Sequence, residues 1–140
     1  MKVETIHLRA PDAPDVHEVT VAEANAGKGL EGDRYYFSDG ARPGLALTLI
    51  EGDVVREAGL APGSTHRQVT VTGTGLNDLV GKKFRVGSVE CYGVMLCEPC
   101  LHLEQMTRPG IIKELVHRAG LNADILTDGS ISVGDEVVEL

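Results

Sequence analysis

The segment of residues 67–87 reads Arg-Gln-Val-Thr-Val-Thr-Gly-Thr-Gly-Leu-Asn-Asp-Leu-Val-Gly-Lys-Lys-Phe-Arg-Val-Gly. Apolar side chains alternate with polar ones twice within it, first at Val69 and Val71 and then at Phe84 and Val86. Period-two alternation is typical of a strand with one buried face. Glycines separate the two segments, and short strands punctuated by glycine favour a barrel or a curled sheet.

The same pattern extends outward from this stretch in both directions. Val19 and Val21 alternate with polar neighbours, and further short apolar runs occur along the chain. We expect additional strands near residues 3–9, 45–50, 88–95, 122–127 and 135–139. The turn signals Asp128-Gly129 and Gly134-Asp135 predict two final hairpins.

Helical patterns interrupt the strands in three places. We expect helices over Ile111–Ala119, over Asp53–Ala58 and from Pro99 onward. The first has apolar residues at 3.6-residue spacing, ends at Gly120, and places Glu114 and Arg118 four residues apart, where they can pair. The sequence therefore predicts a mainly β or α+β fold with two or three flanking helices.

Length, composition and charge bound the function. The chain has 140 residues, 42% of them hydrophobic, and we expect a single domain over residues 1–140. Its 13 basic and 21 acidic residues give a formal charge of −8, which excludes a protein whose main task is to wrap nucleic acid. The sequence shows neither a membrane-spanning apolar run nor a signal segment after Met1, so we expect a cytoplasmic protein that uses no membrane. Residues 82–118 are nevertheless net basic, which hints at an anionic ligand.

A glycine-rich segment at residues 27–34 reads Gly-Lys-Gly-Leu-Glu-Gly-Asp-Arg and matches the G-x-G-x-x-G pattern of dinucleotide sites. That pattern binds pyrophosphate only where its third glycine opens a helix, and the residues after Gly32 cannot sustain one. We therefore reject a Rossmann site. Two interpretations stay open: a ligand loop in which Lys28 and Arg34 contact an anion, or a surface turn in which Asp33 and Arg34 form a local ion pair.

Three cysteines fall within ten residues, at Cys91, Cys97 and Cys100, and His102 follows them. Three thiols and one imidazole are a complete tetrahedral set for zinc, although only Cys97 and Cys100 have the spacing of a structural zinc pair. The same pair could form a reversible disulfide, but the many-stranded pattern does not supply the small α/β sheet of a thioredoxin-like protein.

A single reactive or metal-ligating thiolate is the third interpretation of the cysteines. If Pro99 lies in the first turn of a helix, Cys100 sits where backbone amides favour an anion, although Glu98 opposes this effect. For Cys91, on its strand, we expect a small buried hydrophobe.

Taken together, these motifs resemble a MOSC domain, the C-terminal module of molybdenum-cofactor sulfurases. The similarity rests on residues 67–87 and on Leu96-Cys-Glu-Pro-Cys-Leu-His-Leu103. It also includes Gly27–Arg34, Leu47–Glu51 and the closing segment 120–135, so that it covers nearly the whole chain from about residue 17 to residue 140.

The resemblance implies a β-barrel-like MOSC fold and a role in handling sulfur or the molybdenum cofactor (molybdopterin). Family members include sulfurase modules that bind this cofactor, and reductases in which a cysteine ligates molybdenum and N-hydroxylated compounds are reduced. By position, Cys100 is the first choice for the key thiol and for the molybdenum ligand, and Cys97 is the second. Lys28, Arg34 and Arg67 are the expected contacts to the pterin phosphate.

Two departures from the family pattern change what is expected. Many relatives have asparagine after the arginine of this motif, where the chain has Gln68, so the resemblance puts the geometry of this cofactor contact in question. Larger relatives also carry a pyridoxal-phosphate desulfurase domain, for which this chain is too short. Sulfur, cofactor or electrons are therefore expected from partners: a cysteine desulfurase or other sulfur donor, a molybdoenzyme, or an electron-donor protein.

Two functions of different classes follow. The leading hypothesis is a stand-alone MOSC protein that binds molybdenum cofactor or carries sulfur on the Cys100 thiolate, with a molybdenum-dependent reductase as its narrower form. The alternative is a non-catalytic binding or regulatory barrel whose cysteines are structural or hold zinc.

Overall fold

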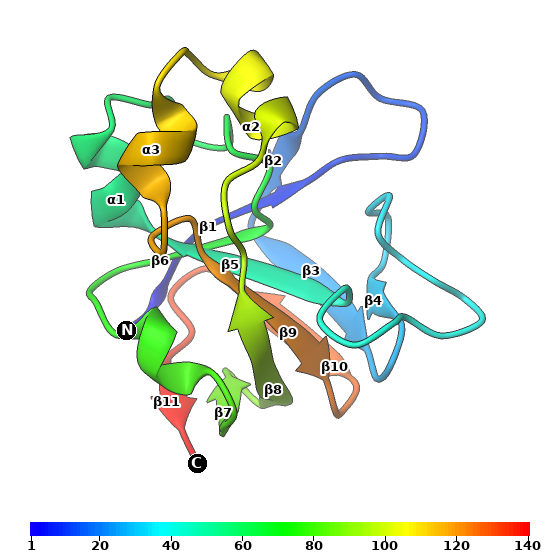
Figure 1. Cartoon of the computed structure of the whole chain (residues 1–140). Coiled ribbons are helices and arrows are strands. Elements are labelled where there is room, and N and C mark those ends of the chain that lie inside the picture. Colours follow the sequence, from blue (N-terminus) through cyan, green and yellow to red (C-terminus); the bar gives the residue numbers. More distant parts are fainter.

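The computed structural model describes all 140 residues and consists mainly of strands (Figure 1). The strands are β1 (Val3–Leu8), β2 (His17–Val19), β3 (Val21–Asn25), β4 (Gly29–Leu30), β5 (Leu47–Glu51), β6 (Val69–Val71), β7 (Lys83–Val86), β8 (Val89–Leu96), β9 (Leu121–Ile125), β10 (Gly129–Ser132) and β11 (Val137–Glu139). The helices are α1 (Gly52–Glu57), α2 (Leu101–Met106) and α3 (Ile111–Leu115), with a 3-10 turn, η1 (Leu76–Leu79). The sequence did not predict this turn.

The strands form two sheets that curl around one core. The larger sheet has the order β11-β7-β8-β9-β5-β6-β1-β2, and the smaller one has the order β10-β3-β4. All pairs are antiparallel except β5 and β6, which are parallel because α1 lies in the connection between them. Backbone hydrogen bonds from Val3 to Asp135 and from Val137 to Met1 join β1 to the far edge of the sheet. This curled, nearly closed sheet confirms the predicted mainly β, barrel-like class.

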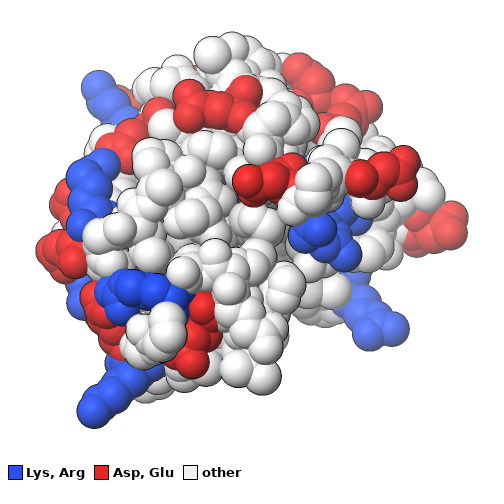
Figure 2. All heavy atoms as spheres, turned by 90° about the horizontal axis from the view of Figure 1, so that it is seen from above, with Lys and Arg blue, Asp and Glu red and all other residues white.

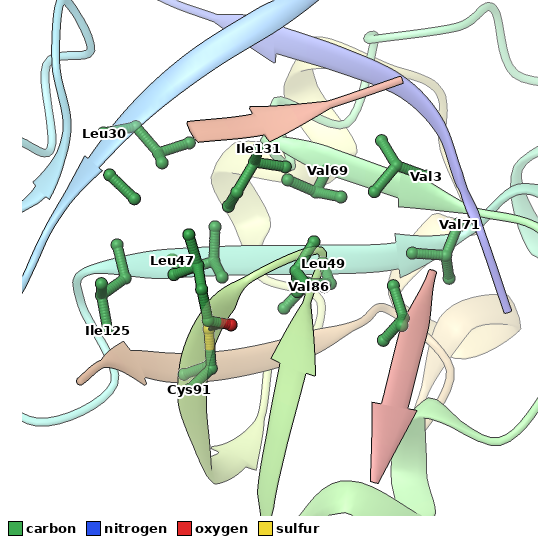
Figure 3. Close-up of a cluster of buried hydrophobic side chains, with 14 of the residues drawn as sticks. Val3, Leu30, Leu47, Leu49, Val69, Val71, Val86, Cys91, Ile125 and Ile131 are labelled. Carbon is green, nitrogen blue, oxygen red and sulfur yellow. Dashed lines mark hydrogen bonds between the residues drawn. The ribbon is translucent and has the colours of Figure 1, made fainter. Parts of the chain in front are cut away.

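Alternating apolar residues from both sheets fill the core. Figure 3 shows that side chains from strands distant in sequence point toward one another, among them Leu49, Val69 and Ile131. The two valines of the opening stretch, Val69 and Val71, are both fully buried. The stretch that alternates most clearly in sequence therefore lies at the centre of the fold.

The three helices gather at one end of the sheet (Figure 1). They share a separate apolar cluster formed by Val54, Ala58, Leu103, Ile111, Leu115 and Ala119. Each helix thus has one buried face, as their spacing predicts. The helices have six residues at most, so none of them could span a lipid bilayer.

Both predicted final hairpins are wrong. The chain bends at Thr127 and turns at Val133 and Gly134, next to the two signals, but β9 pairs with β5 and β8, β10 pairs with β3, and β11 pairs with β7. The strands on the two sides of each connection therefore pair with other strands and not with each other. A turn signal specifies a local reversal and does not specify the partner strand.

The predicted helix over 111–119 is too long. It ends at Leu115, because Val116 leaves the helical region, with ψ 126°, and His117 adopts a left-handed φ of 62°. The expected pair of Glu114 with Arg118 is also wrong: Glu114 binds Arg108, and Arg118 binds Glu57 on α1. Similarly, the alternation at residues 19–21 spans two strands, since β2 and β3 meet at Thr20 and belong to different sheets.

Candidate functional site

A cavity of about 260 Å³ opens between the helical end of the sheet and the loop that precedes β5. We call it the thiol pocket. It is lined by Arg9, Asp33, Arg34, Tyr35, Gly44, Leu45, Thr48, Thr65, His66, Arg67, Gln68, Cys97, Cys100, His102, Leu103, Met106 and Asn122. Five of the six site residues predicted from sequence therefore meet in one cavity. The sixth, Lys28, lies in the turn between β3 and β4, is exposed and does not line the pocket.

Cys97 follows β8 and is half-buried. Its amide donates to the carbonyl of Gly120 at 2.8 Å. Gly120 is required there, because its φ is +121° and a Cβ atom would lie 2.2 Å from the carbonyl oxygen of Leu49. Burial raises the pKa of the Cys97 thiol, and the nearby Arg67 guanidinium partly opposes this rise.

Cys100 is exposed and stands immediately before α2. Its backbone is extended, with φ −132° and ψ 171°, so the helix begins only at Leu101. The prediction that Pro99 occupies the first turn is therefore wrong, and this turn contains no proline. Leu103 anchors α2 in the helical cluster, which fixes the wall of the pocket beside the Cys100 thiol.

Cys91 is separate from the other two cysteines. It is fully buried in the main core, where Figure 3 shows it among apolar side chains, and burial raises its pKa to about 12. The expectation of a small buried hydrophobe is confirmed. No three His, Cys, Asp or Glu side chains converge to hold a metal ion, so the four-ligand zinc set of the sequence is not assembled.

Three arginines line the thiol pocket, and none of them pairs with a carboxylate. The Arg67 guanidinium donates to the carbonyls of Ala119 and Thr65 at 2.9 and 3.1 Å. Arg9 Nε donates to the carbonyl of Ala13 at 2.9 Å, and the Arg34 guanidinium lies 5.2 Å from the ring centroid of Tyr35. These contacts orient the guanidinium groups without neutralising their charge.

Arginines elsewhere are neutralised. Arg56, Arg85, Arg108 and Arg118 each have a carboxylate within ion-pair distance. Figure 2 shows basic and acidic side chains next to one another along its left edge. Three of the four arginines without an ion pair line the pocket, and Arg42 is the fourth. In a chain with 21 acidic residues, this concentration of unpaired guanidinium groups makes the thiol pocket the candidate site for an anion.

Asp33 and Gln68 form a buried polar pair in the pocket wall. Gln68 Nε2 donates to Asp33 Oδ2 at 2.7 Å, and the carboxylate also accepts the amides of Arg9 at 2.8 Å and Tyr35 at 3.0 Å. Gln68 Oε1 accepts the amide of Thr48 at 3.0 Å. Asp33 forms no ion pair with Arg34, so the local ion pair expected in the glycine-rich segment is wrong, although Gly27, Gly29 and Gly32 do adopt the positive φ of a turn-rich loop. No helix follows Gly32, which confirms that the segment is not a Rossmann site.

His66 also faces the pocket, from a left-handed backbone with φ 58°. Its Nε2 lies 3.3 Å from Asp15 Oδ1. Burial and the charge of Arg9 lower its pKa, while Asp15 opposes them. The imidazole is therefore held in its neutral form around pH 7.

Several pocket residues were missed from sequence. Arg9 lies just beyond β1, and no motif surrounds it. His66 directly precedes the Arg67 motif and could have been found by extending that motif by one residue. Asp33 lies inside the glycine-rich segment, but the sequence analysis considered it only as an ion-pair partner of Arg34. Sequence reasoning did note His102, but as a zinc ligand.

Comparisons with known proteins agree with this architecture. The YUAD protein from Bacillus subtilis superposes with a TM-score of 0.79 at 13% identity, covering 97% of this chain and 93% of that one. YiiM from Geobacillus stearothermophilus gives 0.73 at 15% identity, over 99% and 74% of the two chains, and YiiM from Escherichia coli gives 0.69 at 16%, over 100% and 70%. These identities show a shared fold alone.

Sequence comparison narrows the assignment further. A search of curated proteins finds no significant match. The model of one family, the MOSC domain, matches residues 50–138, which include the Arg67 motif, Cys97, Cys100 and the closing strands. With this match over more than half of its length, the chain belongs to the MOSC domain family.

Proposed function

We propose that this protein binds molybdenum cofactor, or carries sulfur on a cysteine thiolate, in the thiol pocket. The observation that supports this most is the meeting of two free thiols with three unpaired arginines in one cavity of an acid-rich chain. A thiolate is a soft ligand for a metal and a nucleophile for sulfur, and guanidinium groups bind phosphate. Membership of the MOSC family, which is linked to molybdenum cofactor, agrees with this combination.

The donor set fits the cofactor. Cys100 offers an exposed sulfur ligand, and Arg67, Arg34 and Arg9 offer cationic donors for a phosphate. The volume, about 260 Å³, lies just below the roughly 300–1,000 Å³ of typical small-molecule pockets, so a larger ligand would extend from the mouth. Bound cofactor would supply two-electron redox chemistry at its metal, and the chain would hold and orient it.

Cys100 is our proposed metal ligand or sulfur acceptor, and Cys97 is second. Exposure makes Cys100 accessible to a partner protein, whereas burial raises the pKa of Cys97 and so favours its protonated thiol form. In sulfur transfer, the Cys100 thiolate would attack the outer sulfur of a persulfide on a partner. A new S–S bond then forms on Cys100, the S–S bond of the donor breaks, and the donor leaves as a thiolate.

The proposed chemistry needs partner proteins that supply sulfur or electrons and that receive the sulfur or cofactor. Sulfur would come from a cysteine desulfurase, in which pyridoxal phosphate does the chemistry, or from another persulfide donor. The sulfur or cofactor would pass to a molybdoenzyme. If the protein instead reduces N-hydroxylated compounds, an electron-donor protein would supply two electrons for each N–O bond that is broken, and two protons would release the oxygen as water. We place these exchanges in the cytoplasm.

Intact mass spectrometry with metal analysis tests this function. Wild-type protein is purified from cells that make molybdenum cofactor and from cells that cannot, and is weighed before and after mild reduction. We expect molybdenum only from the proficient cells, or a reducible mass increase of one sulfur atom that Cys100→Ser abolishes. The matched control, Cys91→Ser, keeps both signals. Protein without molybdenum and without persulfide from either source contradicts the proposal.

A further inference from the structure

A single buried carboxylate connects the segments that carry the three pocket arginines. Asp33 is 4% exposed, yet no cationic side chain pairs with it. Its oxygens accept three hydrogen bonds, from the amides of Arg9 and Tyr35 and from the side chain of Gln68. A buried charge held only by hydrogen bonds is costly, so the arrangement calls for a reason beyond stability.

Each arginine lies within one residue of this network. Arg9 is held directly through its amide, and its carbonyl accepts the amide of Arg34 at 2.7 Å. Arg34 lies between Asp33 and Tyr35, both of which belong to the network. Arg67 precedes Gln68 in the chain. The end of β1, the loop after β4 and the start of β6 thus meet at one hydrogen-bonded pair.

Gln68 extends the network to the central strand β5. Its side-chain Oε1 accepts the backbone amide of Thr48 at 3.0 Å, and the backbone amide of Gln68 donates to Thr48 Oγ1 at 3.0 Å. The side-chain carboxamide therefore uses its nitrogen toward Asp33 and its oxygen toward Thr48. A shorter amide at this position could not reach Asp33 and Thr48 together, which gives a physical reason for glutamine in this chain.

We propose that Asp33 and Gln68 are positioning residues that set the spacing of Arg9, Arg34 and Arg67 for an anionic ligand such as a phosphate monoester. This inference rests on the proposed function, because it concerns the anion half of the same pocket. The arginines provide the charge, and the Asp33–Gln68 pair keeps the segments that carry them from moving apart. Neither residue needs to touch the ligand.

The test measures binding of inorganic phosphate by NMR titration, together with thermal unfolding of every variant. Asp33→Asn replaces one acceptor oxygen by an amide donor that faces donors, and Gln68→Glu places two carboxylates together. We expect each to weaken phosphate binding about tenfold or more, the loss typical of one charged hydrogen bond. The matched control is Asp39→Asn, which makes the same charge change at an exposed site outside the pocket.

A swapped pair separates positioning from general stability. The double variant D33N/Q68E restores the donor–acceptor contact between the two side chains and the single negative charge, but the amide of Tyr35 then faces the new amide nitrogen, so the variant should recover part of the affinity that Q68E loses. Gln68→Met removes the amide at similar volume and keeps the Asp33 charge. It should weaken phosphate binding and also slow alkylation of Cys97, because Arg67 shifts; a purely structural role would leave both unchanged in protein that is still folded.

The outcomes are distinct. Phosphate affinity within twofold of wild type in Asp33→Asn and Gln68→Met, or a folded double variant no better than Q68E, overturns the positioning role while the anion site stands. If Asp33→Asn does not fold, Gln68→Met decides alone by the same criterion. Wild-type protein that binds no phosphate refutes the anion site itself, and with it both this inference and that part of the proposed function.

Discussion

Two hollows at the helical end of the molecule both contain arginine, but only in one of them is the arginine paired with a carboxylate. The thiol pocket holds three arginines without carboxylate partners. The second hollow, about 170 Å³ and lined by Glu51, Asp53, Val54, Glu57, Thr74, Leu76, Asn77, Arg118 and Gly120, we call the acidic cleft. There Arg118 pairs with Glu57, and Glu51 accepts the amides of Gly75 and Leu76.

The net charge of the chain does not show which individual charges are paired and which are not. Charges in the acidic cleft are already satisfied by the protein and are typical of a solvated structural surface. Charges in the thiol pocket are oriented by backbone carbonyls and an aromatic ring but remain uncompensated. Whether each charge has a partner therefore points to the candidate binding site better than the overall charge of −8 does.

Removing one arginine from each hollow should give the largest contrast. Arg67→Gln takes away an uncompensated charge, and we expect phosphate affinity to fall about ten- to a hundredfold. Arg118→Gln removes a charge that Glu57 already neutralises, so affinity should stay within twofold. Calorimetric or NMR titration measures both, and equal losses in the two variants would erase the distinction between the hollows.

Arg67→Gln should also change the pKa of the neighbouring Cys97 thiol. The charge of Arg67 lowers the pKa of Cys97 against the effect of burial, so Arg67→Gln should raise that pKa further. We expect alkylation of Cys97 near pH 8 to slow several-fold, as thiolate is the reactive form. Arg42→Gln, an unpaired arginine outside the pocket, serves as control. Faster alkylation in Arg67→Gln would contradict the predicted electrostatic contact.

Acid should weaken the pocket side of the fold. Burial lowers the pKa of His66, so below the unfolded value of about 6.5 the unfolded chain binds protons more readily than the folded one. Stability is fully present above that pH and is lost as pH falls through the lowered pKa. His66→Asn, whose side chain tolerates the left-handed backbone, should flatten the decline in urea midpoint between pH 7.5 and 5. Part of the decline should persist in this variant, because burial also lowers the pKa of His7. An unchanged profile in His66→Asn would show that His66 is protonated equally in both states.

The smallest effect belongs to the ion pairs of the acidic cleft. Arg118→Gln should change the free energy of unfolding by no more than about 1 kcal/mol, because Arg118 and Glu57 are both substantially exposed. Urea denaturation in low and moderate salt measures this, and salt should shrink the difference. A loss of several kcal/mol would contradict this expectation and would show that the Arg118–Glu57 pair is important for stability.

Local patterns predicted most strands and the helix positions, because burial periodicity depends on nearby residues. Val69, Val71, Phe84 and Val86 all lie in the core, as their alternation indicates. Strand pairing was not predictable in the same way: the connection at residues 126–128 joins two strands, β9 and β10, that pair with different partners. Long-range pairing depends on the whole core rather than on any window of sequence.

The candidate site was predictable where motifs carried it. Cys97, Cys100, Arg34 and Arg67 come from motif segments and meet in the pocket. Arg9 could not be found, since only the fold brings the end of β1 beside those segments. Lys28 was predicted from its place between two glycines, but the β3–β4 turn carries it away from the pocket.

A phosphate titration followed at the arginine Nε–H signals of wild-type protein tests the central claim most directly. The account predicts that the signals of Arg9, Arg34 and Arg67 shift together with one dissociation constant, while those of Arg56 and Arg118 stay in place. Absence of any shift, or larger shifts at Arg56 and Arg118 than in the thiol pocket, would contradict it.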